Sequence, residues 1–194
     1  MPDHQAGAQA NRAVTPLNHK TIIIINGRGG SGKDTLCEIA AEHFRTKNIS
    51  AITPIKEMAK RCGWNGEKDS KSRKFLADLK QAFIAYNDLP GRYLEEECRK
   101  FAQGDDDLLF VHIREGDQID AFKRRAGMKC VTLLVRSPRT AAACYGNDAD
   151  DLVDSYHYDY CYENAKPLDQ LAPDFLSFLR ELLIREGALP ESAQ

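Results

Sequence analysis

The chain has 194 residues, a formal net charge of −2, and 29% charged and 42% hydrophobic residues. A chain of this length buries one sizeable core, so we expect one domain with an excursion. The near-balanced charge argues against a nucleic-acid partner, and no apolar run approaches the roughly 20 residues that span a bilayer, which argues against a membrane partner. Six cysteines without a Cys-x-x-Cys pair favour reduced thiols over disulfides or zinc, and hence a cytoplasmic location.

The first twenty residues, MPDHQAGAQANRAVTPLNHK, have neither the charged start nor the apolar stretch of a signal peptide. We expect residues 1–20 to form a disordered leader, for which a partner-binding role stays open. Residues 21–187 should then form the folded domain.

Strand and helix patterns alternate at the start of this domain. The β-branched run at 21–25 is short and is followed by Asn-Gly, as expected for a fully buried parallel strand. A helix should run from about Lys33 to near Asn48. Residues 49–53 should form a second strand that stops at Pro54.

The pattern from 55 to 104 is helical and highly charged, which indicates a helical excursion from the sheet. Beyond it we expect strands at 107–113, 129–135 and 157–164, a helix at 116–127, and a loop or short helical piece at 136–154. A closing helix should have Pro173 in its first turn and Gly187 as its cap. Strands alternating with helices predict an α/β fold with about five parallel strands and helices on both faces of the sheet.

A glycine-rich loop follows the first strand. Residues 27–33, GRGGSGK, match the pattern G-x-x-x-x-G-K between a strand and a helix, and we call them the phosphate loop. Glycines let backbone N–H groups converge on phosphate oxygens, while the helix N-terminus and Lys33 supply positive charge. The expected nucleotide-binding residues are Gly27, Gly29, Gly30, Ser31, Gly32, Lys33, Asp34 and Thr35.

Asp34 stands where most such loops have the Ser or Thr that binds Mg²⁺. Its carboxylate could face the metal, directly or through water, because Mg²⁺ prefers oxygen ligands. It could equally be a favourable acid in the first turn of a helix. Thr35 remains available to donate to an α-phosphate.

The run Gly-Lys-Asp-Thr at 32–35 resembles the loop of deoxynucleoside monophosphate kinases of phage and bacterial type, and of related phosphomevalonate kinases. The resemblance covers most of residues 21–186, although only the loop motif is highly specific. It implies the three-layer P-loop NTPase fold, with 55–104 as a helical acceptor-binding excursion and 136–150 as a short lid. It also implies ATP and Mg²⁺ as cofactors.

The excursion has cations suited to a phosphate dianion. Its first segment, TPIKEMAKRCGW, is similar to the Pro-x-Lys-Glu segment that opens the acceptor region in those kinases, which implies a role for Lys56. Arginine forks hold such dianions best, so we expect one or two excursion arginines to bind the acceptor. The candidates are Arg61, Arg73, Arg92 and Arg99.

After the third strand, His112 and Arg114 occupy positions where these kinases often have Asp-x-Arg. Arg114 keeps the phosphate-binding position, but His112 replaces the acid that assists Mg²⁺. Glu115, Asp117 or Asp34 could supply the missing oxygen, or metal binding could be weak. A lone histidine at a strand end is more often structural than chemical.

Two further segments extend the resemblance. Arg136 and Arg139 are similar to the lid arginines that clamp ATP phosphates, which implies catalytic roles for both beside Lys33. The Asn-centred turn near the end of these kinases often lies by the adenine base, so Asn164 and Lys166 are base-side candidates.

We therefore expect ATP-dependent phosphoryl transfer to a small phosphorylated acceptor, with a deoxynucleoside monophosphate as first choice. A kinase of a non-nucleotide small molecule, such as phosphomevalonate, would share every motif named above. A nucleotide-binding module without transferase activity is a second alternative, suggested by His112 and the sparse lid. A GTPase is disfavoured because the chain has no Asn-Lys-x-Asp motif.

Overall fold

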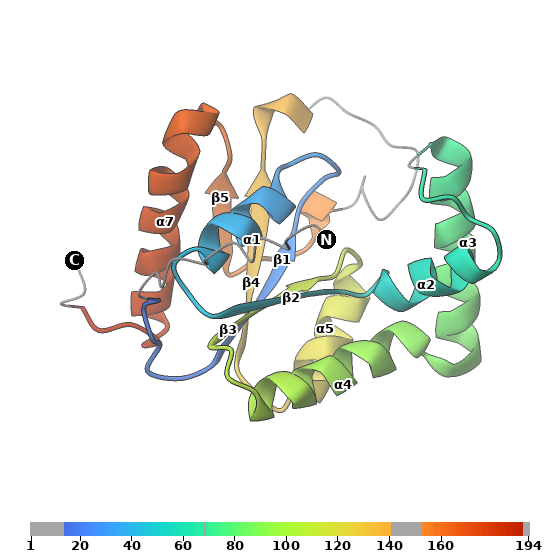
Figure 1. The fold of residues 1–194 in the computed structure, drawn as a ribbon, viewed down its shortest axis with the longest axis horizontal. Coiled ribbons are helices and arrows are strands. Elements are labelled where there is room, and N and C mark those ends of the chain that lie inside the picture. Colours follow the sequence, from blue (N-terminus) through green and yellow to red (C-terminus); the bar gives the residue numbers. More distant parts are fainter. Residues whose placement is uncertain (1–13, 68, 141–152, 192–194) are drawn as a thin grey trace, which may run out of the picture.

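The computed structural model describes residues 14–67, 69–140 and 153–191. Five strands form one parallel sheet in the order β2-β3-β1-β4-β5 (Figure 1). The strands are β1 (Thr21–Asn26), β2 (Thr46–Ser50), β3 (Leu108–His112), β4 (Cys130–Arg136) and β5 (Tyr160–Glu163). The helices are α1 (Lys33–Ala41), α2 (Thr53–Arg61), α3 (Ser70–Asn87), α4 (Leu89–Gln103), α5 (Gly116–Arg125) and α7 (Leu168–Arg185), with short 3₁₀ helices η1 (Pro138–Thr140) and η2 (Val153–Ser155).

The central strand, β1, faces two hydrophobic cores. Ile23 and Ile25 lie in a core formed with α1 and α7, whereas Ile22 and Ile24 lie in a core formed with α4 and α5. A strand with apolar residues at both phases of its period-2 pattern is covered on both faces. The structure thus confirms the predicted α/β fold of five parallel strands with helices on both faces (Figure 1).

The parallel strands bring their carboxyl ends to one edge of the sheet. Because β1 lies between β3 and β4, the segments 27–32, 113–115 and 137–140 leave this edge side by side. Ligands of open α/β sheets bind at such an edge. The phosphate loop therefore lies where a binding site is expected.

The boundaries of α1 and β2 were predicted wrongly. Helix α1 ends at Ala41, well before Asn48, and β2 spans Thr46–Ser50 instead of 49–53. Two facts explain the shift: Phe44 is buried against α1 and α7, and Ile49 is the only buried residue of β2. An edge strand with one buried side chain does not show the apolar pattern from which strands are predicted.

The closing helix also begins earlier than predicted. Helix α7 starts at Leu168, so Pro173 lies inside it and not in its first turn. The burial of Leu171 in the core explains why the helix extends to this side of the proline. The predicted cap at Gly187 is confirmed: its φ is 75°, and the N–H of Ala188 donates to Leu183 O at 2.8 Å.

Residues 14–20, expected to belong to the disordered leader, pack on the domain. The N–H of Thr15 donates to His43 O at 2.8 Å, and the N–H of Asn18 donates to Ala188 O at 2.8 Å. The Lys20 Nζ donates to Gly104 O at 2.7 Å. The leader prediction is therefore wrong for residues 14–20, and residues 1–13 lie outside the described part of the chain.

The predicted excursion consists of α2, α3 and α4, which connect β2 to β3. Helix α3 is mostly exposed, and Lys80 is its one buried residue. Of the predicted lid, only 136–140 fall within the described residues. No helix in the described ranges has the length and apolar content needed to cross a bilayer.

Candidate functional site

The phosphate loop makes a turn that requires glycine at two positions. Gly27 has a φ of 147°, and a Cβ there would overlap Val135 O. Gly32 has a φ of 92°, and a Cβ there would overlap Asn164 Nδ2. Left-handed backbone and close packing thus both exclude side chains. The turn therefore needs glycine at positions 27 and 32.

Lys33 begins α1, and its side chain folds over the phosphate loop. The Nζ donates to Gly27 O at 2.6 Å, to Arg28 O at 3.0 Å and to Ser31 Oγ at 3.3 Å. The first turn of a helix also presents backbone N–H groups that have no partner within the helix. One ammonium and one helix N-terminus therefore meet inside a narrow backbone turn, which is an arrangement suited to phosphate.

Asn164 supports the loop from the end of β5. Its backbone N–H donates to Arg136 O at 2.7 Å, and its Nδ2 donates to Ser31 O at 2.8 Å. The residue is only 4% exposed, and its Oδ1 has no hydrogen-bond partner among the described atoms. The structure thus brings Asn164 to the predicted site, but beneath the loop. Lys166 is exposed in the segment that follows.

A chain of hydrogen bonds links the loop to η2. The N–H of Gly27 donates to Asn26 Oδ1 at 2.8 Å, and Asn26 Nδ2 donates to Tyr158 Oη at 2.7 Å. The Tyr158 hydroxyl donates in turn to Val153 O at 2.9 Å. Asn26 is 1% exposed, so its amide is fixed by these bonds. Sequence reasoning missed Asn26 and Tyr158, although an asparagine directly after four isoleucines is a signal that could have identified Asn26.

His112 lies at the end of β3, and its Nε2 is 3.8 Å from Cys37 Sγ. Burial lowers the pKa of His112 to about 4, so the imidazole is neutral at pH 7. Burial raises the pKa of the Cys37 thiol to about 12, and the nearby Asp34 carboxylate adds to this rise. The two groups are therefore a neutral pair, and Cys37 is not an activated nucleophile.

Four charged residues shift the pKa of His112, and all four were predicted to belong to the site. Asp34 opposes the fall of the His112 pKa, whereas Lys33, Arg114 and Lys56 add to it. Arg114 leaves β3 beside the phosphate loop, since its backbone O accepts a hydrogen bond from Asn26 Nδ2 at 2.8 Å, and the charge of Lys56 acts on the neighbouring His112. Both approach from the side of β3 and α2.

The four arginines of the excursion lie less favourably for binding the phosphate of an acceptor. Arg61, Arg73 and Arg92 are exposed. Arg99 forms an ion pair with Glu96 at 2.6 Å on the outer surface of α4. The end of α4 lies by the amino edge of the sheet, since Lys20, just before β1, bonds to Gly104 O. The structure therefore does not bring Arg99 to the loop.

An ion pair that sequence reasoning missed joins the excursion to the segment after β3. Lys80 Nζ lies 2.6 Å from Glu115 Oε2, and the side chains are only 9% and 22% exposed. Glu115, a candidate for the missing metal-site acid, is therefore already bound by a cation. Asp117 is exposed in the first turn of α5.

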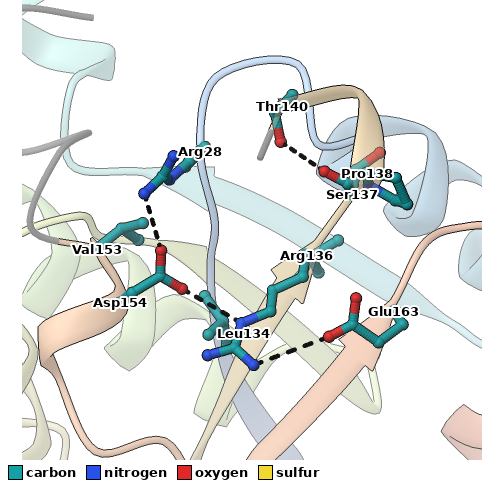
Figure 2. Close-up of a pocket in the computed structure, with 10 residues that line it drawn as sticks. Arg28, Leu134, Arg136, Ser137, Pro138, Thr140, Val153, Asp154 and Glu163 are labelled. Atoms are coloured by element: carbon teal, nitrogen blue, oxygen red, sulfur yellow. Dashed lines mark hydrogen bonds and ion pairs between the residues drawn. The ribbon is translucent and has the colours of Figure 1, made fainter. Parts of the chain in front are cut away.

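A cavity of about 550 Å³ opens between the phosphate loop, the ends of β4 and β5, and η1 and η2. Figure 2 shows Asp154 between two arginines: it lies 3.2 Å from Arg28 and 3.2 Å from Arg136. Arg136 also approaches Glu163 at 3.8 Å. The predicted Arg136 thus lines the cavity, while Arg139 is exposed in η1. Arg28, Asp154 and Glu163 were not predicted as site residues.

The residues at the loop fit a metal that arrives with a nucleotide. Within the described ranges, no group of three His, Cys, Asp or Glu side chains is close enough to hold a metal ion by itself. Asp34 and Thr35 are exposed oxygen donors in the first turn of α1. Mg²⁺ keeps water and phosphate ligands beside one or two carboxylates, so this donor set is compatible with Mg·ATP.

No protein-family model and no curated protein matches the chain. Among solved structures, a presumed kinase from Chloroflexus aurantiacus aligns over 87% of this chain and 98% of its own, with a TM-score of 0.52 and 11% identity. Thymidylate kinase from Candida albicans aligns over 89% and 94%, with a TM-score of 0.50 and 14% identity. Likeness at such identities establishes the fold alone. Together with the sheet order and the loop at the end of β1, it shows that the chain has the fold of the P-loop kinases.

Proposed function

We propose that the protein transfers the γ-phosphoryl group of ATP to a small phosphorylated acceptor. The observation that carries this proposal is the phosphate loop, in which the Lys33 ammonium and the N-terminus of α1 meet in a turn that excludes side chains at Gly27 and Gly32. Such a site is built for the phosphates of a nucleotide. The fold shared with P-loop kinases supports a transferase over a simple anion site.

Phosphoryl transfer is accelerated mainly by position and charge, so cations and backbone amides have the principal roles. Lys33 would leave its loop carbonyls to bind the β- and γ-phosphates, and the N–H groups of 29–35 would surround the phosphate chain. Arg136, at the cavity, and Arg139 would neutralise charge on the transferring group. Asn164 would act as a positioning residue that holds Ser31.

Mg²⁺, when bound with the nucleotide, would neutralise charge on the β- and γ-phosphates. We assign its protein contact to Asp34, which is exposed beside Lys33. If this is correct, Asp34→Ala should raise the Mg²⁺ concentration needed for half-maximal turnover several-fold. An unchanged Mg²⁺ titration would assign Asp34 to the helix N-terminus alone.

The acceptor would bind on the other side of the loop, where Lys56 and Arg114 lie. Arg61, Arg73 and Arg92 remain candidates for a second contact from the excursion. A deoxynucleoside monophosphate is the first acceptor to test, because the Gly-Lys-Asp-Thr run resembles kinases of that class and a thymidylate kinase has the same fold. A non-nucleotide phosphate such as phosphomevalonate is the second.

The test is ADP formation from Mg·ATP across a panel of deoxy- and ribonucleoside monophosphates and phosphomevalonate, with a reaction lacking acceptor as control. A large stimulation by one compound would establish the transferase and identify its acceptor. Slow hydrolysis that no acceptor stimulates would contradict the proposal.

One observation favours a second candidate, a nucleotide-binding module without transferase activity. A neutral His112 stands where related kinases have an acid, and the nearby Glu115 is already paired with Lys80. This candidate predicts tight binding of Mg·ATP without turnover for any acceptor of the panel.

A further inference from the structure

Two arginines from distant parts of the chain converge on one carboxylate beside the phosphate loop. Arg28 lies within the loop, and Arg136 ends β4; we call them the arginine pair. Arg28 Nη2 lies 3.2 Å from Asp154 Oδ2, and Arg136 Nε lies 3.2 Å from Asp154 Oδ1. Each guanidinium thus uses a different oxygen of the same carboxylate (Figure 2).

The position of Asp154 is fixed by the fold. Its neighbour Val153 is 2% exposed, and Val153 O accepts the hydrogen bond from the Tyr158 hydroxyl. Tyr158 is bonded to Asn26, which is bonded to the first N–H of the phosphate loop. The Asp154 carboxylate is therefore held beside the phosphate loop by buried hydrogen bonds as well as by its own ion pairs.

A carboxylate and a phosphate present similar oxygen acceptors to a guanidinium. The arginine pair, Asp154 and the adjoining cavity of about 550 Å³ form one continuous surface beside the loop. The side chains of Arg28, Asp154 and Arg136 are 25%, 40% and 51% exposed, so their ion pairs are weak enough to exchange. A phosphate that reaches this surface finds two guanidinium groups that are already close together, and both are bound to the Asp154 carboxylate.

We propose that Asp154 is a built-in anion that occupies the arginine pair until phosphoryl oxygens of a nucleotide displace it. The inference rests on the proposed function and adds a determinant of nucleotide affinity. Asp154 holds the two guanidiniums close together in the resting protein and competes with the ligand for them. The resting contact favours ligands with several phosphates, because a polyphosphate can displace the carboxylate and still bind Lys33.

The test measures binding of Mg·ATP and of inorganic triphosphate to the full chain by isothermal titration calorimetry. Asp154→Asn keeps the shape of the side chain and removes its charge. We expect a dissociation constant about twofold to tenfold lower for both ligands, as for the release of two solvent-exposed ion pairs. Asp78→Asn, which removes a carboxylate from an exposed ion pair with Lys74 on α3, is the matched control and should leave both constants unchanged.

A double-mutant cycle ties the effect to the arginine pair. In an Arg28→Met background, Asp154→Asn should give a smaller gain, because one of the two competing contacts is already gone. Glu163→Gln should also give a smaller gain, since Glu163 approaches Arg136 alone and at 3.8 Å. Asp154→Ser provides a second removal of the charge if Asp154→Asn does not fold.

The outcomes separate this inference from the proposed function. If the wild type binds Mg·ATP and Asp154→Asn binds it equally or more weakly, Asp154 is a structural support and the inference is overturned. A purely structural role cannot tighten triphosphate binding. If neither protein binds Mg·ATP or triphosphate, the proposed function fails, and the inference fails with it.

Discussion

The candidate site, at the edge where the carboxyl ends of the strands lie, has two sides that are built in different ways. On the nucleotide side, meaning the phosphate loop with the ends of β4 and β5, buried amides of Asn26 and Asn164 join separate strands to the loop. On the acceptor side, meaning α2, α3 and α4, most cations are exposed, and two ion pairs, Lys80 with Glu115 and Lys47 with Glu97, are partly buried. The nucleotide side is thus held by buried side-chain amides that bind the loop, whereas the acceptor side presents mostly exposed cations that do not indicate one ligand.

The largest expected effect concerns the nucleotide side. Lys33→Ala should lower turnover by about 10²–10³-fold or more, because it removes a preorganised charge at the transferring phosphate. The fold should remain, since the Lys33 ammonium contacts loop carbonyls and not the core. ADP formation and the thermal midpoint should be measured together. Lys74→Ala, from an exposed pair on α3, is the control, and equal turnover in the two variants would contradict the mechanism.

A second prediction concerns His112, which lies where the two sides meet. Its pKa falls from 6.5 to about 4 on folding because of burial, so the unfolded chain binds more protons between these pH values. The stabilisation that depends on a neutral His112 is therefore complete above pH 6.5. It is lost as the pH falls towards 4, which lowers the free energy of unfolding by up to about 3 kcal/mol.

His112→Gln should flatten the pH dependence of the free energy of unfolding in this window, as measured by urea denaturation. His157→Gln, at an exposed position, is the control and should keep the wild-type slope. An unchanged slope in His112→Gln would show that the imidazole is accessible to protons in the folded state.

The next prediction uses two glycines with the same backbone angle. Gly32 and Gly63 both have a φ of 92°, but a Cβ at Gly63 meets nothing within 4 Å, whereas one at Gly32 overlaps the Asn164 amide. Both alanine variants should lose about 1 kcal/mol of stability from left-handed backbone. Gly32→Ala should lose about 1–3 kcal/mol more, because Asn164 must release Ser31 O. Equal losses in urea denaturation would show that Asn164 does not restrain the loop.

The smallest effect is expected on the acceptor side. Lys80→Met should lower the free energy of unfolding by about 1–2 kcal/mol, because it leaves the Glu115 carboxylate partly buried without its cation. Adding Glu115→Gln should restore part of this loss. Breaking the exposed Lys74–Asp78 pair on the same helix should change stability by less than about 0.5 kcal/mol. If Lys80→Met behaves like that control, the Lys80–Glu115 pair does not anchor α3 to the segment after β3.

The same contrast explains what the sequence could predict. The strand β1, the phosphate loop and the start of α1 are contiguous, and each has a local pattern, so these elements could be predicted from the sequence. The edge strand β2 was misplaced because burial of a single residue leaves no period to detect. Pro173 misled the prediction of α7, because a proline inside a helix is rarer than one in its first turn.

The unpredicted contacts of the site join residues that are distant in the chain, even where a residue itself, such as Asn164, was predicted. Asn26 meets Tyr158 across 132 residues, Asn164 meets Ser31 across 133, and Lys80 meets Glu115 across 35. No spacing rule connects such residues, since their contact depends on the order of strands in the sheet. Arg99 is the opposite case: its charge suits a phosphate, but it lies near the end of α4, which reaches the amino edge of the sheet.

The segment 14–20 has a practical consequence for choosing where a shortened chain should begin. A start at Thr21, suggested by the first strand, would remove the ammonium of Lys20 from the face of the Phe101 ring, 4.9 Å from its centre. It would also remove the backbone hydrogen bonds from Thr15 to His43 O, just after α1, and from Asn18 to Ala188 O, just after α7. A start at Val14 retains all three contacts, and the melting temperatures of the two truncated chains would measure their joint contribution to stability.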